Sequence, residues 1–181
     1  MNTRTSVTMG PTGSEARLVT GEVTVSAMRT ETGFVLAAMD GRVIAGDARF
    51  NVRITDDDAV CATCIAGSLR VEQHAKAISL TAGEQVTYSD SGMAEPAKID
   101  PGTVTAWNDG IVVFDAAPVS QVITEINRYR PGKIILTNDE LGRRLFSARL
   151  RVENIGNVVR QIELAFNARA RALPGGITLL G

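Results

Sequence analysis

The sequence is poor in the residues from which most catalytic and metal sites are built. Its 181 residues include a single histidine, His74, and two cysteines. One histidine cannot supply a histidine-based metal cluster or a catalytic triad, and no glycine-rich phosphate loop follows a strand-like run. We therefore expect a protein that is not an enzyme, with no catalytic residues, no cofactor and no bound metal, and with His74 at the surface or in a turn.

The chain also lacks a long hydrophobic run. Its longest purely apolar stretch is Phe34–Met39, whereas a helix that crosses a bilayer needs about 20 apolar residues. The opening MNTRTSVTMGPTGSEAR has no apolar core of the kind that defines a signal peptide. We expect no membrane contact from these residues, in a protein that is either cytosolic or a piece of a longer one.

A strong excess of positive charge is missing as well. The net charge is −1, and a duplex-binding protein needs a marked basic surface, so we do not expect nucleic acid as a partner. The total conceals an asymmetry. Residues 1–117 hold 9 Lys and Arg against 15 Asp and Glu, a net of −6, and residues 118–181 hold 10 against 5, a net of +5. Such a division favours two modules with different surfaces.

The two cysteines form a C-x-x-C motif that allows three interpretations. A redox C-x-x-C needs its first cysteine at a helix N-terminus, whereas AVCATCIAG is strand-like, and residues three apart on a strand point to opposite faces. Two packed or half-packed thiols at Cys61 and Cys64 are the simplest interpretation. A local disulfide across a bulge and a thiol oxidoreductase site remain open. The run Asp56–Asp58 is a solvated turn or a weak cation site.

The first half of the chain has a period of two. From Arg17 to about Tyr88, short runs rich in β-branched residues are separated by Gly and Asp turns. Strands repeated every 8–12 residues predict an all-β domain over residues 1–88, either a sandwich or a roll. Residues 89–110 lose this period and gather Ser, Gly, Pro and Asp, which predicts a linker.

After residue 110 the period becomes helical. Pro118 suits the first turn of a helix, and an apolar stripe follows at Val119, Val122, Ile123 and Ile126. Pro131-Gly132 ends this helix, and the order repeats with a second stripe after Asn154, an expected N-cap. The expected strands are 111–114, 133–137, 145–152, 169–172 and 177–180. Residues 111–181 therefore predict a small α/β domain of two strand–helix–strand units.

Several phrases of the first half resemble the periplasmic domain of FecR-family regulators. GRVIAGDARFNVR, AVCATCIAGSLRVE and ISLTAGEQVTY are similar to the family phrases GT-x-F-x-V, V-x-V-x-x-G-x-V-x-V and L-x-x-G-E. Asp47 and Ala48 depart from the usual wording. TGEVTV, at residues 20–25, resembles the earlier GE phrase of the family.

The segment AWNDGIVVFDAAPVSQVITEINRY carries the most specific resemblance. The positions that match the family pattern are Trp107, Gly110, Phe114, Pro118, Val122, Glu125, Arg128 and Tyr129. The remainder, to Gly181, resembles the short domain that also occurs at the N-termini of secretins and TonB-dependent transducers. Together the resemblance covers nearly the whole chain, and it marks a domain and not a reaction.

The resemblance implies a periplasmic fragment of a single-pass inner-membrane protein, because the family's cytoplasmic anti-sigma segment, transmembrane helix and first strands are not in this chain. The implied partner is the N-terminal signalling domain of a TonB-dependent outer-membrane transducer, in the regulation of iron (siderophore) uptake. A cytoplasmic sigma factor would be reached through the missing N-terminal region. The alternative function is a secretin-like structural module that self-associates.

For the partner contact we expect the edge of the small C-terminal sheet, because an open edge offers unpaired N–H and C=O groups. The candidate partner-binding residues are Lys133, Ile135, Arg149 and Arg151, all on the expected solvent side of their strands. An apolar Ile135 is equally consistent with a second sheet face covered by a helix.

Overall fold

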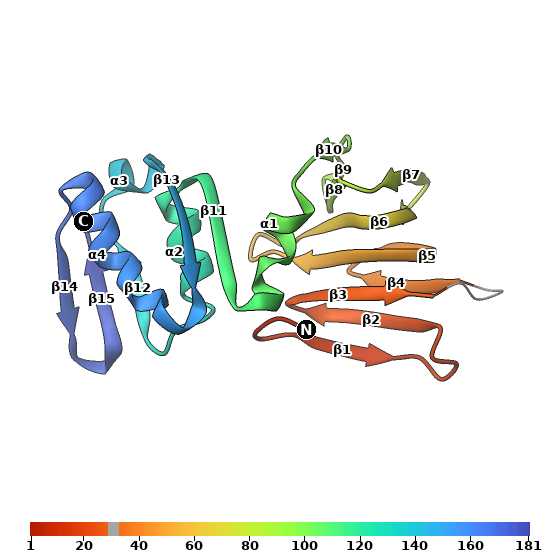
Figure 1. Cartoon of the computed structure of the whole chain (residues 1–181), viewed down its shortest axis with the longest axis horizontal. Helices are drawn as coiled ribbons and strands as arrows, with labels where there is room; N and C mark the ends of the chain where they lie inside the picture. Colours follow the sequence, from red (N-terminus) through yellow and green to blue (C-terminus); the bar gives the residue numbers. More distant parts are fainter. Residues whose placement is uncertain (29–32) are drawn as a thin grey trace. The chain divides into compact units, whose positions relative to one another are not determined.

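The computed structural model describes residues 1–28 and 33–181 (Figure 1). It is mostly β-strand, in agreement with the prediction of a β-rich domain. The chain divides into two compact units, Met1–Thr105 and Ala106–Gly181. None of the described helices is both long enough and apolar enough to cross a bilayer.

In the described residues of the first unit there are strands and one short helix. These are β1 (Ser6–Met9), β2 (Glu15–Thr20), β3 (Glu22–Ala27), β4 (Phe34–Ala38), β5 (Gly41–Ile54), β6 (Ala59–Gln73), β7 (Lys76–Thr81), β8 (Glu84–Ser89), β9 (Gly92–Met93), β10 (Ala97–Lys98) and α1 (Pro101–Thr105). Over the described residues the strands join in one sheet with the main path β1-β2-β4-β5-β6-β8-β10, while β3, β7 and β9 pair with β5, β6 and β8.

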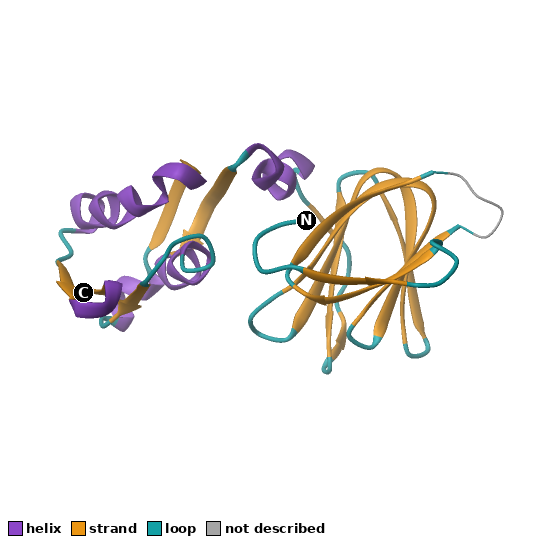
Figure 2. Cartoon of the chain, turned by 90° about the horizontal axis from the view of Figure 1, so that it is seen from below, coloured by secondary structure: helices purple, strands orange, loops and turns teal. Residues whose placement is uncertain are grey.

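The long strands β5 and β6 each belong to two layers of this sheet. Strand β5 pairs with β4 over residues 41–45 and with β3 over residues 48–53, and β6 divides in the same way between β7 and β8. A register shift between Ala45 and Ala48 marks the junction. Bulges bend a strand and let it pass from one layer to the next. Figure 2 shows the strands of this unit curving around a common interior.

Alternating side chains of these strands fill that interior. Phe50, Val60 and Leu80 are fully buried. Tyr88 is 1% exposed, and its hydroxyl donates to the Ala38 carbonyl oxygen at 3.0 Å. The Tyr88 ring lies against Gly41, where an added Cβ would come within 2.6 Å of it. The period of two therefore places apolar side chains inward, as the sequence indicates.

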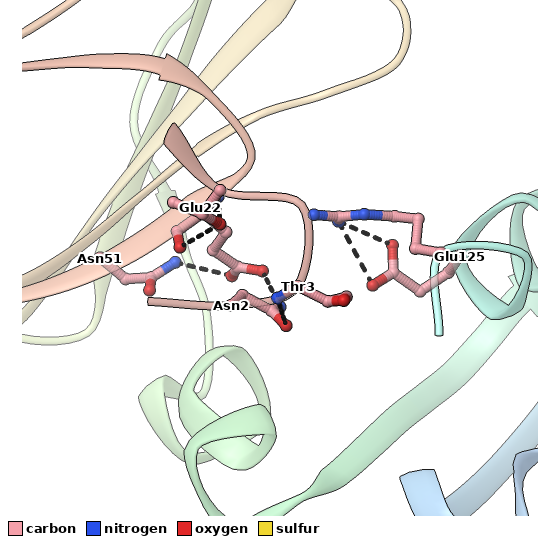
Figure 3. Close-up of polar contacts among 7 residues, drawn as sticks. Asn2, Thr3, Glu22, Asn51 and Glu125 are labelled. Atoms are coloured by element: carbon pink, nitrogen blue, oxygen red, sulfur yellow. Dashed lines mark hydrogen bonds and ion pairs between the residues drawn. The ribbon is translucent and has the colours of Figure 1, made fainter. Parts of the chain in front are cut away.

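A buried carboxylate holds the N-terminal segment onto the first unit (Figure 3). Glu22 is 4% exposed. Its Oε1 accepts from Asn51 Nδ2 at 2.9 Å, and its Oε2 accepts from Asn2 Nδ2 at 2.7 Å. Both amide oxygens are occupied too, since Thr24 Oγ1 donates to Asn51 Oδ1 and the Thr3 N–H donates to Asn2 Oδ1. A buried charge needs such partners, because without them its desolvation costs several kcal/mol.

Residues 89–110 hold more regular structure than their composition predicts. Strands β9 and β10 both pair with β8, and Met93 of β9 is buried in the first unit's apolar cluster. Helix α1 and the 3₁₀ helix η1 (Ala106–Asp109) follow. The pairing of two-residue strands depends on the strand beside them, so composition alone does not reveal it.

The second unit alternates strands and helices. Its elements are β11 (Ile111–Pro118), α2 (Val119–Ile126), β12 (Lys133–Leu136), α3 (Asp139–Arg143), β13 (Leu145–Arg151), η2 (Val152–Asn157), α4 (Val158–Phe166), β14 (Ala170–Leu173), η3 (Pro174–Gly176) and β15 (Ile177–Leu180). In place of one small sheet there are two, β11-β13 and β12-β15-β14. The short helix α3 was not expected; the Asn138 side chain caps it by accepting from the N–H groups of Glu140 and Leu141.

The two apolar stripes face inward as predicted. All four stripe residues of α2 are at most 4% exposed, and Val158 and Ile162 of α4 are fully buried. They share one apolar cluster with Ile134 of one sheet and Leu150 of the other. The expected N-cap at Asn154 is wrong, because η2 occupies that position and α4 begins at Val158.

Candidate partner-binding surface

Trp107 and Gly110 stand at the entry to the second unit. Trp107 lies on η1 and is half-buried. Gly110 has φ +68°, a left-handed value that glycine adopts without strain. Its N–H donates to the Trp107 carbonyl oxygen, and its own carbonyl oxygen accepts from the Val152 N–H at 2.8 Å. These bonds fix the start of β11 beside the end of β13.

The next matched positions build the scaffold. Phe114 of β11 is 9% exposed and packs in the unit's apolar cluster. Pro118 ends β11 and is the N-cap of α2, a place where the missing proline N–H costs no helical hydrogen bond. Val122 is fully buried on α2. These residues hold strand and helix together.

The polar residues that follow lie at the end of α2. The helix ends at Ile126, several residues before the Pro131-Gly132 end that the sequence predicts. Arg128 Nη1 lies 3.3 Å from Glu125 Oε2, and both side chains are at most 10% exposed. Tyr129 packs against the apolar cluster of the second unit.

The Asn127 side chain forms hydrogen bonds with the backbone of the neighbouring strand, β12. Its Nδ2 donates to the Ile134 carbonyl oxygen at 2.9 Å, and its Oδ1 accepts from the Ile134 N–H at 2.8 Å. Strand β12 pairs with β15. The N–H and C=O groups of Ile134 are not used in that pairing, because they bond to Asn127. The backbone groups at this edge of β12 are therefore already bonded at Ile134. A partner strand cannot pair with β12 there in the way that the sequence predicts.

The four candidate residues do not come together on one strand edge. Lys133 and Ile135 lie on β12, and both are exposed, Ile135 by 39%. Arg149 and Arg151 are exposed on β13, which belongs to the other sheet. The structure thus divides the candidates into two pairs, one on the outside of each sheet.

The sheet β12-β15-β14 brings further residues beside the first pair. In Figure 1, β14 and β15 run side by side at the blue end of the chain. The register places Ile135, Leu179 and Arg171 in one row across the three strands. A second row holds Lys133, Ile177 and Leu173. The sequence does not single out the residues of β14 and β15, because a four-residue strand does not show which of its faces is covered.

The cysteines are both free thiols, Cys64 buried and Cys61 partly exposed. Cys64 Sγ donates to the Gly67 carbonyl oxygen at 3.5 Å, and Cys61 Sγ lies 3.5 Å from Thr87 Oγ1. Burial raises the pKa of the Cys64 thiol, and the charge of Glu84 raises it further. A raised pKa disfavours the thiolate, which is the form that redox chemistry needs.

The single histidine of the sequence lies in a turn. His74 stands in the turn between β6 and β7 with 73% of its side chain exposed, as expected, and its Nε2 is 3.3 Å from Asp40 Oδ2. Over residues 1–28 and 33–181, no three His, Cys, Asp or Glu side chains gather in an arrangement that could hold a metal ion.

Comparison with known proteins identifies the fold. No family model matches the chain, and no curated protein matches it. Two crystal structures, each of a proposed anti-sigma factor from Parabacteroides distasonis ATCC 8503, are similar to it. One has a TM-score of 0.85 and 20% identity over 100% of this chain and 88% of that chain. The other has a TM-score of 0.84 and 21% identity over 99% and 87%.

The chain has an anti-sigma-factor-like fold. The similarity to the two structures extends through both units, although about four residues in five differ. It therefore shows how the backbone is arranged, while any partner has to be argued from this chain's own surface residues.

Proposed function

We propose that this protein is the signal-receiving part of a transmembrane regulator of a sigma factor. The observation that carries the proposal is the fold match to a proposed anti-sigma factor, which covers the whole chain at a TM-score of 0.85. The phrases that resemble the FecR family support it independently, because they are a property of the sequence and the match is a property of the backbone.

The proposed partner is the N-terminal signalling domain of a TonB-dependent outer-membrane transducer involved in iron (siderophore) uptake. The family-like positions support a binding role for the second unit, since Gly110, Phe114 and Pro118 act as scaffold and leave the outer sides of the strands for recognition. Exposed cations and an exposed Ile135 on those outer sides suit a protein partner.

The same proposal locates these residues in the periplasm. A sigma factor in the cytoplasm would be contacted by a part of the protein outside the 181 residues. The second unit resembles, in sequence, a domain also present in the proposed partner, so recognition would join two small domains of related design.

Calorimetric titration tests the proposal. The full 181-residue chain is titrated with the signalling domain of the transducer encoded nearest its gene, at two temperatures, because apolar burial changes the binding enthalpy with temperature. We expect one-to-one binding at micromolar affinity or tighter, about −8 kcal/mol or more favourable.

The matched control is the signalling domain of a different transducer from the same genome, which should bind at least tenfold more weakly. Absence of heat at both temperatures, with both proteins folded by circular dichroism, would contradict the proposal. Concentration-dependent oligomers without any transducer would instead favour the secretin-like assembly module.

A further inference from the structure

We propose that the outer face of the three-stranded sheet, made by Lys133, Ile135, Arg171, Leu173, Ile177 and Leu179, is the surface that docks the protein partner. The partner surface that it fits has an apolar centre surrounded by acidic residues. This inference rests on the proposed function, because it assigns the surface through which that function is carried out.

The two faces of this sheet are both apolar, which is unusual for a sheet with one solvent-facing side. The inner face packs in the unit's apolar cluster through Ile134 and Leu180, at 1% and 0% exposure. Strand alternation turns the neighbouring residues to the opposite side. A solvent-facing side normally carries polar residues, but here the central strand contributes Ile177 and Leu179.

The apolar residues of the outer face are not buried in the protein's own apolar core. Ile135 is 39% exposed, and Leu173, Ile177 and Leu179 are half-buried. Within the described chain, none of these four belongs to the apolar cluster of the second unit or to the side chains packed against it. The register places Ile135 opposite Leu179 and Leu173 opposite Ile177, so the four side chains form one apolar strip across the three strands.

Cations border this strip, and no acid interrupts it. Lys133 and Arg171 are exposed on the two outer strands of the sheet. Arg169, which exchanges backbone hydrogen bonds with Gly181, continues the β14 side with a further exposed cation. Strands β12, β14 and β15 contain no Asp or Glu. An apolar centre with a charged border is the usual anatomy of a protein interface.

The distribution of charge decides which kind of partner fits. A second copy of the chain, docked face to face, would bring cations against cations, and like charges at an interface are costly. An acidic border on the partner would pair with Lys133 and Arg171 instead. We therefore commit to a different, acidic protein surface.

The size of the face sets the strength of the contact. Four residues at about 3.3 Å each and three strands at about 4.8 Å spacing cover on the order of 200 Å². A standard stable interface buries about 800 Å² on each partner. The outer face is therefore the centre of an interface and not all of it, which suits a reversible signalling contact.

The test compares charge-inserting variants on and off the face, in the full chain, titrated with the transducer signalling domain. Ile135→Glu and the double variant Lys133→Glu/Arg171→Glu change exposed side chains, so folding should be preserved. The controls Leu164→Glu and Arg160→Glu change an apolar residue that is 76% exposed and an exposed cation on α4. A third pair, Arg149→Glu/Arg151→Glu, tests the outside of the other sheet.

We expect both outer-face variants to weaken binding at least tenfold and the α4 controls to change it less than twofold. Wild-type affinity in both outer-face variants overturns the assignment but leaves the proposed function standing, and a selective loss in the β13 pair would move the site to the other sheet. No binding by the wild type rejects the proposed function and the docking surface with it. Dimerisation of the wild type that Ile135→Glu abolishes would show that the occupant is a second copy.

Discussion

At the scale of single residues, polar side chains form hydrogen bonds with backbone N–H and C=O groups that have no partner strand. Asn127 is the clearest case, because its amide satisfies both the N–H and the C=O of Ile134 at 2.8 and 2.9 Å. It performs the role that another strand would perform on that edge of β12. The residue is half-buried, so the two groups would regain only part of this bonding from water.

The substitution Asn127→Ala should lower the free energy of unfolding by about 1–2 kcal/mol, since two hydrogen bonds to partly buried groups are lost. Urea denaturation at pH 7 measures it. The control is Asn157→Ala, at an exposed residue whose side chain makes no capping bond to α4. That change should stay within about 0.5 kcal/mol. Equal effects of the two substitutions would refute the bridging role.

Tyr88 supplies a second residue-scale prediction, on pH dependence. Burial raises the pKa of the Tyr88 phenol, and the charge of Asp40 raises it further. In the unfolded chain this phenol ionises near pH 10. The folded form binds the proton more tightly, so stability is fully present below about pH 10 and is lost as the pH rises above it, at up to about 1.4 kcal/mol per pH unit.

The variant Tyr88→Phe cannot ionise at this position, so its unfolding free energy should fall less steeply between pH 9 and 11 than that of the wild type. At pH 7 the variant should lose about 1 kcal/mol with the hydrogen bond to the Ala38 carbonyl. Chemical denaturation at several pH values measures both effects. Parallel slopes for the two proteins would show that Tyr88 does not cause the alkaline loss.

At the scale of elements, two glycine turns set the start of the three-stranded sheet. Gly132 precedes β12 with φ +85°, and Gly176 precedes β15 with φ +77°. The turns touch, because a Cβ on Gly132 would collide with the backbone carbonyl oxygen of Gly176. Since β12 and β15 are parallel neighbours, this contact places both strands at a common starting level.

Gly132→Ala should therefore destabilise the protein by about 2–4 kcal/mol, from the left-handed backbone and the steric conflict together. Gly156→Ala is the matched control: nothing lies within 4 Å of its added Cβ, and its φ is not positive. That variant should be unchanged or more stable by up to about 1 kcal/mol. Thermal and urea unfolding compare them, and similar losses in both would argue against the contact between the turns.

At the scale of the whole molecule, charge is divided between the two units. Residues 1–105 hold 9 Lys and Arg against 13 Asp and Glu, a net of −4, and residues 106–181 hold 10 against 7, a net of +3. An acidic partner would be attracted to the second unit and repelled by the first. The near-zero total charge therefore conceals two units of opposite net charge.

Partner binding should weaken as salt rises, because charges at the border of an interface act mainly through screened attraction. We expect a several-fold loss of affinity for the transducer domain between 50 and 300 mM NaCl. The double variant Lys133→Glu/Arg171→Glu should flatten or reverse this dependence, and Arg160→Glu should leave it nearly as it is. Titrations at four salt concentrations provide the comparison. A salt-independent wild-type affinity would speak against an acidic partner surface.

The sequence by itself determined the elements whose pattern is local. The period of two predicted a β-rich first half, and the stripes at Val119–Ile126 and around Val158–Ile162 predicted two buried helix faces, because burial follows repeats that one strand or helix displays alone. Lys133 and Ile135 could be placed on the solvent side of a strand for the same reason.

Only the tertiary structure decided how these elements pair. It divided the strands of the second unit between two sheets, bonded Asn127 to Ile134, and placed Leu173, Ile177 and Leu179 beside Ile135. Register and strand order depend on contacts between residues far apart in the chain. The sequence of a four-residue strand also does not show whether one of its faces or both are covered. The proposed docking surface therefore follows from the tertiary structure, because only strand pairing brings its residues together.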